Sequence, residues 1–86
     1  MTINYSKTFM KLFDKSPQHI RKAIVERIKC FEANPYDPIL NNHALKGEFS
    51  GRRSINITGD WRAIYENKPN DEAFFILIGT HSELYG

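Results

Sequence analysis

The sequence predicts an α+β fold in which two N-terminal helices pack on one face of an antiparallel β-sheet. Within the first 33 residues, apolar side chains recur at steps of three and four, which is the period of a helix. Beyond residue 52 they alternate with polar residues, which is the period of a strand. The 86 residues are 41% hydrophobic and 26% charged, so we expect a single globular domain over residues 1–86 with one core.

The chain is expected to open with a short strand at residues 3–5 and a brief helix from Ser6 to Phe13. Ser16-Pro17 then predicts the start of a second helix. Serine caps exposed helix amides, and proline is tolerated at the first helical position.

The second helix is expected to run to about Ala33, where Asn34-Pro35 ends it. On its polar face, Lys22 and Glu26 have the spacing of an ion pair. Its opposite face carries a stripe of Ile20, Ala23, Ile24, Arg27, Ile28 and Phe31.

Residues 34–42 contain two prolines and three asparagines and are expected to form a loop. Three strands then follow, at residues 53–58, 61–66 and 73–78, separated by the turn Gly59-Asp60 and by a second polar turn. Two helices followed by such a meander favour a sheet with helices on one face, so polar strand residues would emerge on the other face.

The charge distribution is uneven although the net charge is only +2. Residues 1–43 carry seven Lys and Arg against four Asp and Glu, whereas residues 44–86 carry five against six. This weak basic bias is compatible with RNA or with an acidic protein partner.

No apolar run is long enough to span a membrane, and the N-terminus lacks the apolar region of a signal peptide. The single Cys30 has no disulfide partner and is expected to be a small interior side chain. These observations predict a cytoplasmic protein without a membrane partner.

His81 is the strongest candidate for proton transfer, since an imidazole titrates near cellular pH. It follows an apolar strand and Gly79-Thr80, where a sharp turn would aim it back across the sheet end; the alternative is a surface histidine in a C-terminal tail. His43 stands in a loop and is either solvated or functional, and His19 reads as a surface residue. The three histidines lack metal-site spacing, so neither a metal nor another cofactor is expected.

Three further residues have both a chemical and a structural interpretation. Asp60 can orient an imidazole or accept a proton, or simply belong to the turn. Trp61 shares a strand face with Ala63 and Tyr65, so it either packs in the core or stacks on a base. Tyr85 can stack on a base, donate a proton or fill the sheet edge.

Cations near the predicted strands are candidates for phosphate contacts. Arg62 lies on the strand face opposite Trp61, and its guanidinium offers a bidentate fork. Arg52, Arg53 and Lys46 offer similar charge. For each of these residues, solvated surface charge is the alternative.

Several motifs together resemble the RelE/ParE superfamily of bacterial type II toxins, and most closely its YafQ-like branch. They are Leu45-Lys46-Gly47, Gly51-Arg52-Arg53, Gly59-Asp60-Trp61-Arg62, Ile64-Tyr65 and the terminal stretch from Gly79 to Gly86. The resemblance covers nearly the whole chain and implies a RelE/ParE-like microbial RNase-type fold, which agrees with the element pattern.

The resemblance also implies an activity: metal-independent cleavage of mRNA in the ribosomal A site, in which the ribose 2′-hydroxyl attacks the neighbouring phosphate. Matched by motif, His43, Asp60, His81 and Tyr85 would be catalytic and Trp61 would contact RNA. By chemistry, Lys46, Arg52, Arg53 and Arg62 would supply phosphate charge. The implied partners are the ribosome, its mRNA and a cognate antitoxin, with DNA contacted only through the antitoxin.

Two positions depart from the branch. Asn56 stands where YafQ-like toxins carry a histidine, and Leu77 stands where they carry an arginine. An amide moves no proton near neutral pH, and a leucine makes no phosphate contact. The alternatives are therefore a ParE-like inhibitor of DNA gyrase without enzymatic activity, or a decayed toxin that still binds its antitoxin.

Overall fold

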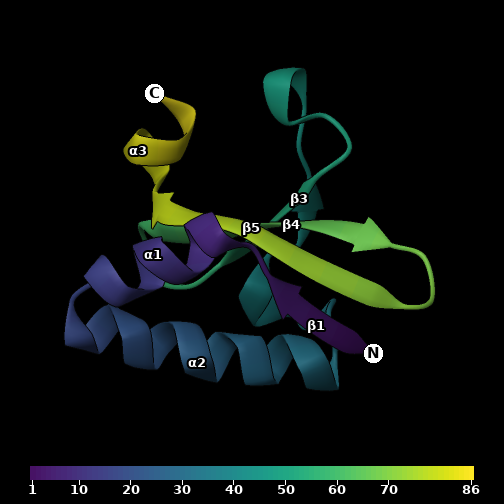
Figure 1. The fold of residues 1–86 in the computed structure, drawn as a ribbon, viewed down its shortest axis with the longest axis horizontal. Helices are drawn as coiled ribbons and strands as arrows, with labels where there is room; N and C mark the ends of the chain where they lie inside the picture. The colour runs from purple at the N-terminus through teal and green to yellow at the C-terminus, as the bar shows by residue number, and fades with distance from the viewer.

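The computed structural model describes all 86 residues as one five-stranded sheet flanked by helices (Figure 1). The helices are α1 (Lys7–Lys15), α2 (Gln18–Ala33) and α3 (His81–Tyr85), with short 3₁₀ turns η1 (Pro38–Leu40) and η2 (Gly47–Phe49). The strands are β1 (Thr2–Tyr5), β2 (His43–Ala44), β3 (Arg53–Asn56), β4 (Trp61–Lys68) and β5 (Glu72–Thr80). Figure 1 shows α1 and α2 on one side of the sheet, and α3 with the η2 loop on the other. The predicted α+β architecture is confirmed.

The sheet is mixed, not fully antiparallel. Its strand order is β1-β5-β4-β3-β2, and β1 pairs with β5 in parallel, from Thr2 opposite Glu72 to Tyr5 opposite Phe75. A hairpin turn would force an antiparallel pair, but a helical connection permits a parallel one. Because β1 leads into α1 and meets β5 only at the end of the chain, no turn constrains its direction.

Ser16 ends α1 and does not cap α2, so that part of the prediction is wrong. Its hydroxyl donates to the carbonyl oxygen of Leu12 at 2.7 Å, and its main-chain N–H donates to Phe13. The helix α2 follows Pro17 with no side-chain cap. The serine that caps a helix is Ser6, whose Oγ accepts a 2.9 Å hydrogen bond from the N–H of Phe9.

The expected ion pair between Lys22 and Glu26 is also not formed. The carboxylate of Glu26 instead lies 3.9 Å from the ammonium group of Lys29. Both side chains are about 70% exposed. Such an exposed pair contributes little to stability, so its loss or exchange has little effect on the fold.

The core lies between α1, α2 and the sheet and is rich in aromatic rings. Phe31 of α2 packs edge-on against Tyr65 of β4 at 4.9 Å and against Phe75 of β5 at 5.2 Å between ring centroids. Leu40 of η1, inside the predicted loop, is fully buried and closes this layer, and the half-buried Cys30 packs against it. None of the helices has the length and apolarity that crossing a bilayer requires.

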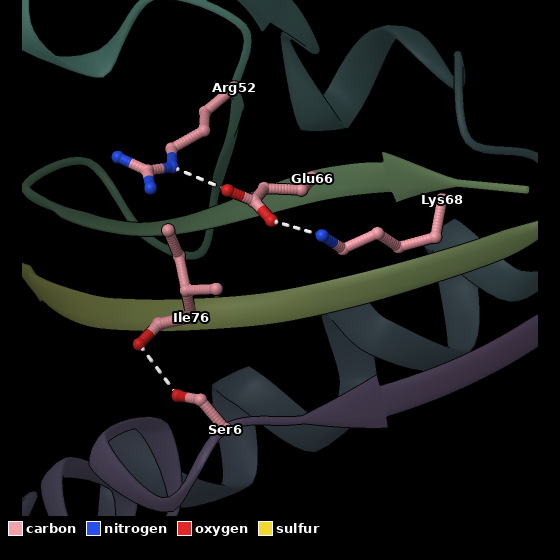
Figure 2. Close-up of polar contacts among 5 residues, drawn as sticks. All are labelled: Ser6, Arg52, Glu66, Lys68 and Ile76. Atoms are coloured by element: carbon pink, nitrogen blue, oxygen red, sulfur yellow. Dashed lines mark hydrogen bonds and ion pairs between the residues drawn. The ribbon is translucent and has the colours of Figure 1, made fainter.

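A register shift between Ile64 and Tyr65 of β4 links the sheet to α1. On β5 it places Tyr65 opposite Phe75 and leaves Ile76 outside the pairing. The carbonyl oxygen of Ile76 accepts a 2.9 Å hydrogen bond from the hydroxyl of Ser6 (Figure 2). The N-terminus of α1 is thereby fixed to the middle of β5.

Candidate active site

The sheet face turned away from α1 and α2, which we call the site face, carries most of the side chains that the sequence singled out. Directly paired strand residues point to the same side of a sheet. Two rows of paired residues define the site face: Asn56–Arg62–Gly79 and His43–Ser54–Ile64–Leu77. In Figure 1, α3 and the η2 loop rise from this face at separate places.

His81 is the first residue of α3, so it is held in a defined helix and not in a loose tail. The hydroxyl of Thr80 accepts from the N–H of Glu83 at 3.2 Å, and the carboxylate of Glu83 accepts from the N–H of Thr80 at 2.7 Å. This capping box satisfies two amides that the helix would otherwise leave unpaired. The hydrogen bonds from the backbone and then the side chain of Thr80 hold the pKa of Glu83 below its usual range.

The turn between β3 and β4 provides a second support for His81. The main-chain N–H of His81 donates a 2.9 Å hydrogen bond to the main-chain oxygen of Asp60. The imidazole itself is exposed. The Asp60 side chain is exposed as well and makes no recorded hydrogen bond within the protein, so Asp60 adjoins His81 through its backbone.

Gly79 explains how closely α3 approaches β5. A Cβ atom at this buried position would lie 3.3 Å from the side chain of Leu84 and 3.3 Å from the carboxylate of Glu83. Any side chain would therefore push α3, and with it His81, away from the sheet.

Tyr85 joins α3 to the η2 loop. Its ring lies edge-on to His81, with 4.8 Å between centroids, and edge-on to Phe49 at 5.9 Å. Its hydroxyl oxygen is buried and has no hydrogen-bond partner in the protein. A buried hydroxyl without a partner costs about 1–3 kcal/mol, which the packing of the Tyr85 ring against His81 and Phe49 has to offset.

His43 flanks the site face on β2, an edge strand that lies three strands away from β5. It pairs with Ser54 in the antiparallel β2–β3 ladder, which places its side chain on the site face. Its Nδ1 lies 2.8 Å from the carbonyl oxygen of Asn41. A carbonyl can only accept, so Nδ1 is the donor in this contact, and in the neutral imidazole the lone pair is then on Nε2. Nε2 can then act as a base.

Trp61 does not lie on the site face. Its half-buried ring packs against the hydrophobic core and borders a cavity of about 200 Å³ beside Leu12 and Ile78. Of the two interpretations of Trp61, packing in the core and stacking on a base, the structure thus shows the first.

Arg53 also points to the helix side. Its Nε donates to the side-chain oxygen of Asn42 at 2.8 Å, and its guanidinium lies 5.6 Å from the centre of the Tyr36 ring. Arg53 and Arg52 are adjacent in the chain and therefore face opposite sides of the sheet.

Arg62 lies on the site face but is partly engaged. Its Nη1 donates to the main-chain oxygens of Thr58 at 3.0 Å and Trp61 at 3.1 Å. Half-buried in this way, the guanidinium stabilises the turn that carries Asp60 and leaves its remaining donors unused. Lys46 is exposed at the start of η2.

Two charged residues that the sequence did not single out as site residues belong to this face. Glu66 of β4 accepts from Nε of Arg52 at 2.8 Å and from Nζ of Lys68 at 2.9 Å (Figure 2). Lys68 and then Arg52 hold the pKa of Glu66 below its usual range. Alternation along β4 places residues 66 and 68 on the same face as Arg62. This alternation is visible in the sequence and could have identified both residues.

Asn56 and Leu77, the two residues that depart from the YafQ-like pattern, lie in different surroundings. The side-chain oxygen of Asn56 is buried without a hydrogen-bond partner, as is the hydroxyl of Ser54. Leu77 lines an apolar cavity of about 310 Å³ with Phe49 and Leu84. Neither residue can move a proton near neutral pH, so the two side chains themselves add no acid, base or positive charge to the site face.

Comparison with known proteins identifies the family. The family described as "Bacterial toxin of type II toxin-antitoxin system, YafQ" matches residues 1–86. A sequence search of curated proteins gives no match.

Among solved structures, YafQ from E. coli strain BL21(DE3) is 26% identical, with a TM-score of 0.76 and coverage of 98% of this chain and 97% of that one. HP0894 from Helicobacter pylori is 28% identical, with a TM-score of 0.75 and 99% of each chain covered. A YoeB/ParE toxin from Agrobacterium tumefaciens shares the fold at 18% identity, with a TM-score of 0.77 over 94% of this chain and 99% of that one.

The mixed sheet, the two helices behind it and the family match over the full sequence lead to one assignment: the chain belongs to the YafQ family of bacterial toxins of type II toxin-antitoxin systems.

Proposed function

We propose that this toxin is a ribosome-dependent endoribonuclease that cleaves mRNA in the A site without a metal ion. The observation that carries the proposal is that His43 on the edge strand β2 and His81 at the end of β5 flank a sheet face that also bears Arg52 and Arg62. The backbones of β2 and β5 are separated by three strand spacings, about 14 Å, and both imidazoles are exposed.

In the proposed reaction, Nε2 of His43 removes the proton of the ribose 2′-hydroxyl. The 2′-oxygen attacks the adjacent phosphorus, the bond from phosphorus to the 5′-oxygen breaks, and protonated His81 donates its proton to that leaving oxygen. The products are a 2′,3′-cyclic phosphate and a 5′-hydroxyl. An in-line displacement requires the base and the acid on opposite sides of the phosphorus, and the proposal assigns these two positions to His43 and His81.

The other site-face residues support these two steps. Arg62 contributes charge near the transferred phosphate, and Tyr85, whose ring lies edge-on to His81, supports that imidazole. Preorganised donors of this kind stabilise developing negative charge without reorganising during the reaction. Asp60 positions His81 through its main-chain oxygen. Lys46 adds positive charge at η2, whereas Trp61 and Arg53 support the site from the helix side.

The experiment is mRNA cleavage in a translating extract, mapped by primer extension. Wild-type protein is expected to cut within A-site codons, and His43→Ala and His81→Ala are each expected to slow cleavage by about 10²–10⁴-fold. His19→Ala is the matched control, since His19 is an exposed histidine on α2, behind the sheet. Absence of cuts from folded wild-type protein would overturn the proposal; inhibition of gyrase supercoiling would then support the ParE-like alternative.

The acid and base assignment is tested by the pH dependence of the rate. A base must be deprotonated, so His43 accounts for the rise in rate as the pH increases; an acid must be protonated, so His81 accounts for the fall at higher pH. Residual activity of His43→Ala should lose the rise, and that of His81→Ala should lose the fall. The reverse pattern would exchange the two roles.

We further propose that a cognate antitoxin neutralises the protein, as the E. coli DinJ-YafQ complexes among its relatives suggest. An apolar groove of about 340 Å³ lies between α1 and α2, where Tyr5, Met10 and Val25 are about 40–46% exposed. Exposed apolar side chains that lie together are typical of a protein interface. The apolar face of an amphipathic antitoxin helix would fit such a groove. Val25→Glu should block neutralisation and leave cleavage intact, whereas Ile39→Glu, an exposed position outside the groove, should change neither.

A further inference from the structure

One carboxylate on the site face holds two cations at once. Glu66 binds Nε of Arg52 through one oxygen, at 2.8 Å, and Nζ of Lys68 through the other, at 2.9 Å. The three side chains are 36%, 22% and 42% exposed for Arg52, Glu66 and Lys68, so solvent and ligands reach the cluster. With two positive charges against one negative, it carries a net charge of +1.

The hydrogen bond to Glu66 leaves the two terminal nitrogens of Arg52 free. A guanidinium has five N–H donors, and Nε supplies one of them. The two terminal nitrogens of Arg52 make no recorded hydrogen bond to the protein, and Figure 2 shows them directed away from Glu66. Two terminal nitrogens held in one plane are suited to bidentate binding of a phosphate.

Lys68 has an aromatic neighbour on the same face. Its ammonium lies 5.8 Å from the centre of the half-buried Phe74 ring, and Phe74 is paired with Glu66 across β4 and β5. Surfaces that bind single-stranded nucleic acid typically combine two features: cations that contact the phosphate backbone, and aromatic side chains on which bases stack.

The cluster is separate from the proposed cleavage point. Glu66 is four residues along β4 from Arg62, which at about 3.3 Å per residue is a separation of about 13 Å. A phosphate at the cluster would therefore belong to a flanking nucleotide. An exposed structural ion pair contributes little to stability, so stability alone explains the arrangement poorly.

We infer that Arg52 and Lys68, oriented by Glu66, form a subsite that binds a backbone phosphate of the RNA substrate at a nucleotide flanking the cleavage position. This inference rests on the proposed nuclease function and adds a substrate contact to it. Arg52 supplies the bidentate fork, Lys68 the second positive charge, and Glu66 acts as a positioning residue.

The test measures binding of a labelled single-stranded RNA oligonucleotide with 2′-O-methyl groups, which cannot be cleaved, at several salt concentrations. Arg52→Gln and Lys68→Gln are each expected to weaken binding about tenfold, and each should reduce the slope of log affinity against log salt by about 0.7. Lys29→Gln is the control, because Lys29 makes a comparable ion pair with Glu26 on α2, behind the sheet, and should change neither quantity.

Glu66→Gln tests whether RNA lies close enough to the cluster to respond to the charge of Glu66, while the orientation of Arg52 is kept. The amide oxygen still accepts from Nε of Arg52, so the fork stays in place while one negative charge is removed. We expect RNA binding to tighten a few-fold; a merely structural ion pair would leave RNA affinity unchanged. Arg52→Lys should bind almost as weakly as Arg52→Gln, because lysine has no planar fork.

The outcomes distinguish this inference from the proposed function. Unchanged affinity and salt slope in both Arg52→Gln and Lys68→Gln would overturn the subsite, while A-site cleavage by wild-type protein would still support the nuclease. Weaker oligonucleotide binding in these variants, with no cleavage by the wild type, would support the subsite and overturn the nuclease. Wild-type protein with no affinity for the oligonucleotide would overturn the subsite.

Discussion

The main-chain N–H of His81 donates a 2.9 Å hydrogen bond to the main-chain oxygen of Asp60. This contact joins the start of α3 to the turn between β3 and β4. It therefore brings the Gly-Asp-Trp motif at residues 59–61 next to the Gly-Thr-His motif at residues 79–81. A helix of five residues is too short to be stable alone. The position of the His81 imidazole therefore depends on a few local contacts that can be changed singly.

Removing the cap of α3 should reduce activity more than stability. Thr80→Val lacks the hydroxyl that accepts from Glu83 and should destabilise α3 by about 1 kcal/mol. We expect faster amide exchange in residues 81–85 and slower mRNA cleavage, with little change in the global unfolding temperature. Ser6→Ala, which removes the cap of α1, is the control: it should lower the unfolding temperature and leave exchange in α3 unchanged. Equal effects of both variants on cleavage would contradict this account.

Adding a methyl group at Gly79 should displace α3. The new Cβ would lie 3.3 Å from Leu84 and Glu83, so Gly79→Ala should cost about 1–3 kcal/mol and slow cleavage. Gly59→Ala provides a matched control, because a Cβ there meets nothing within 4 Å; its effect on stability should stay within about 0.5 kcal/mol. Urea unfolding and primer extension measure the two effects. A Gly79→Ala variant with wild-type stability and cleavage would show that α3 is less closely held than the structure indicates.

Asn42 should be more important for stability than its exposure suggests. Its amide nitrogen donates to the carbonyl oxygen of Pro35 at 2.9 Å and to the buried hydroxyl of Tyr65 at 2.7 Å, and its oxygen accepts from Arg53. Asn42→Ala leaves the Tyr65 hydroxyl without its partner and should cost about 2 kcal/mol in urea unfolding.

Tyr65→Phe removes one hydrogen bond and leaves the others of Asn42 intact, so it should cost only about 1 kcal/mol. A larger cost for Tyr65→Phe than for Asn42→Ala would contradict this ranking.

Acid should weaken the protein through Glu66. Lys68 and Arg52 lower the pKa of Glu66 in the folded state from its ordinary value of 4.5. A carboxylate with a lowered pKa contributes stability that is complete above about pH 4.5 and is lost as the pH falls through the folded-state value. Urea unfolding between pH 6 and pH 3 should therefore show a shallower loss of stability in Glu66→Gln than in the wild type. Parallel curves would show that the cluster contributes nothing to the pH dependence.

Local patterns in the sequence determined the elements and the chemistry. The change from helical to alternating periodicity predicted the brief first helix, the longer second helix and the strands β3, β4 and β5, and it predicted that Trp61 and Arg62 face opposite sides of the sheet. The terminal Gly-Thr-His-Ser-Glu stretch contains its own capping box, so the information that places His81 in a helix is local, and it excludes the loose C-terminal tail that is the alternative.

Only the tertiary structure decided which distant residues meet. The contacts of Glu66 with Arg52, Asn42 with Tyr65 and His81 with Asp60 join residues 14 to 23 positions apart. They depend on strand register, which a single sequence does not specify. Contacts in the folded chain also decided three further features. They are the parallel pairing of β1 with β5, the hydrogen bond from Ser16 that ends α1, and the contact of His43 Nδ1 with the carbonyl oxygen of Asn41. In each case, hydrogen-bond partners supplied by the folded chain selected one of several arrangements that the local sequence permits.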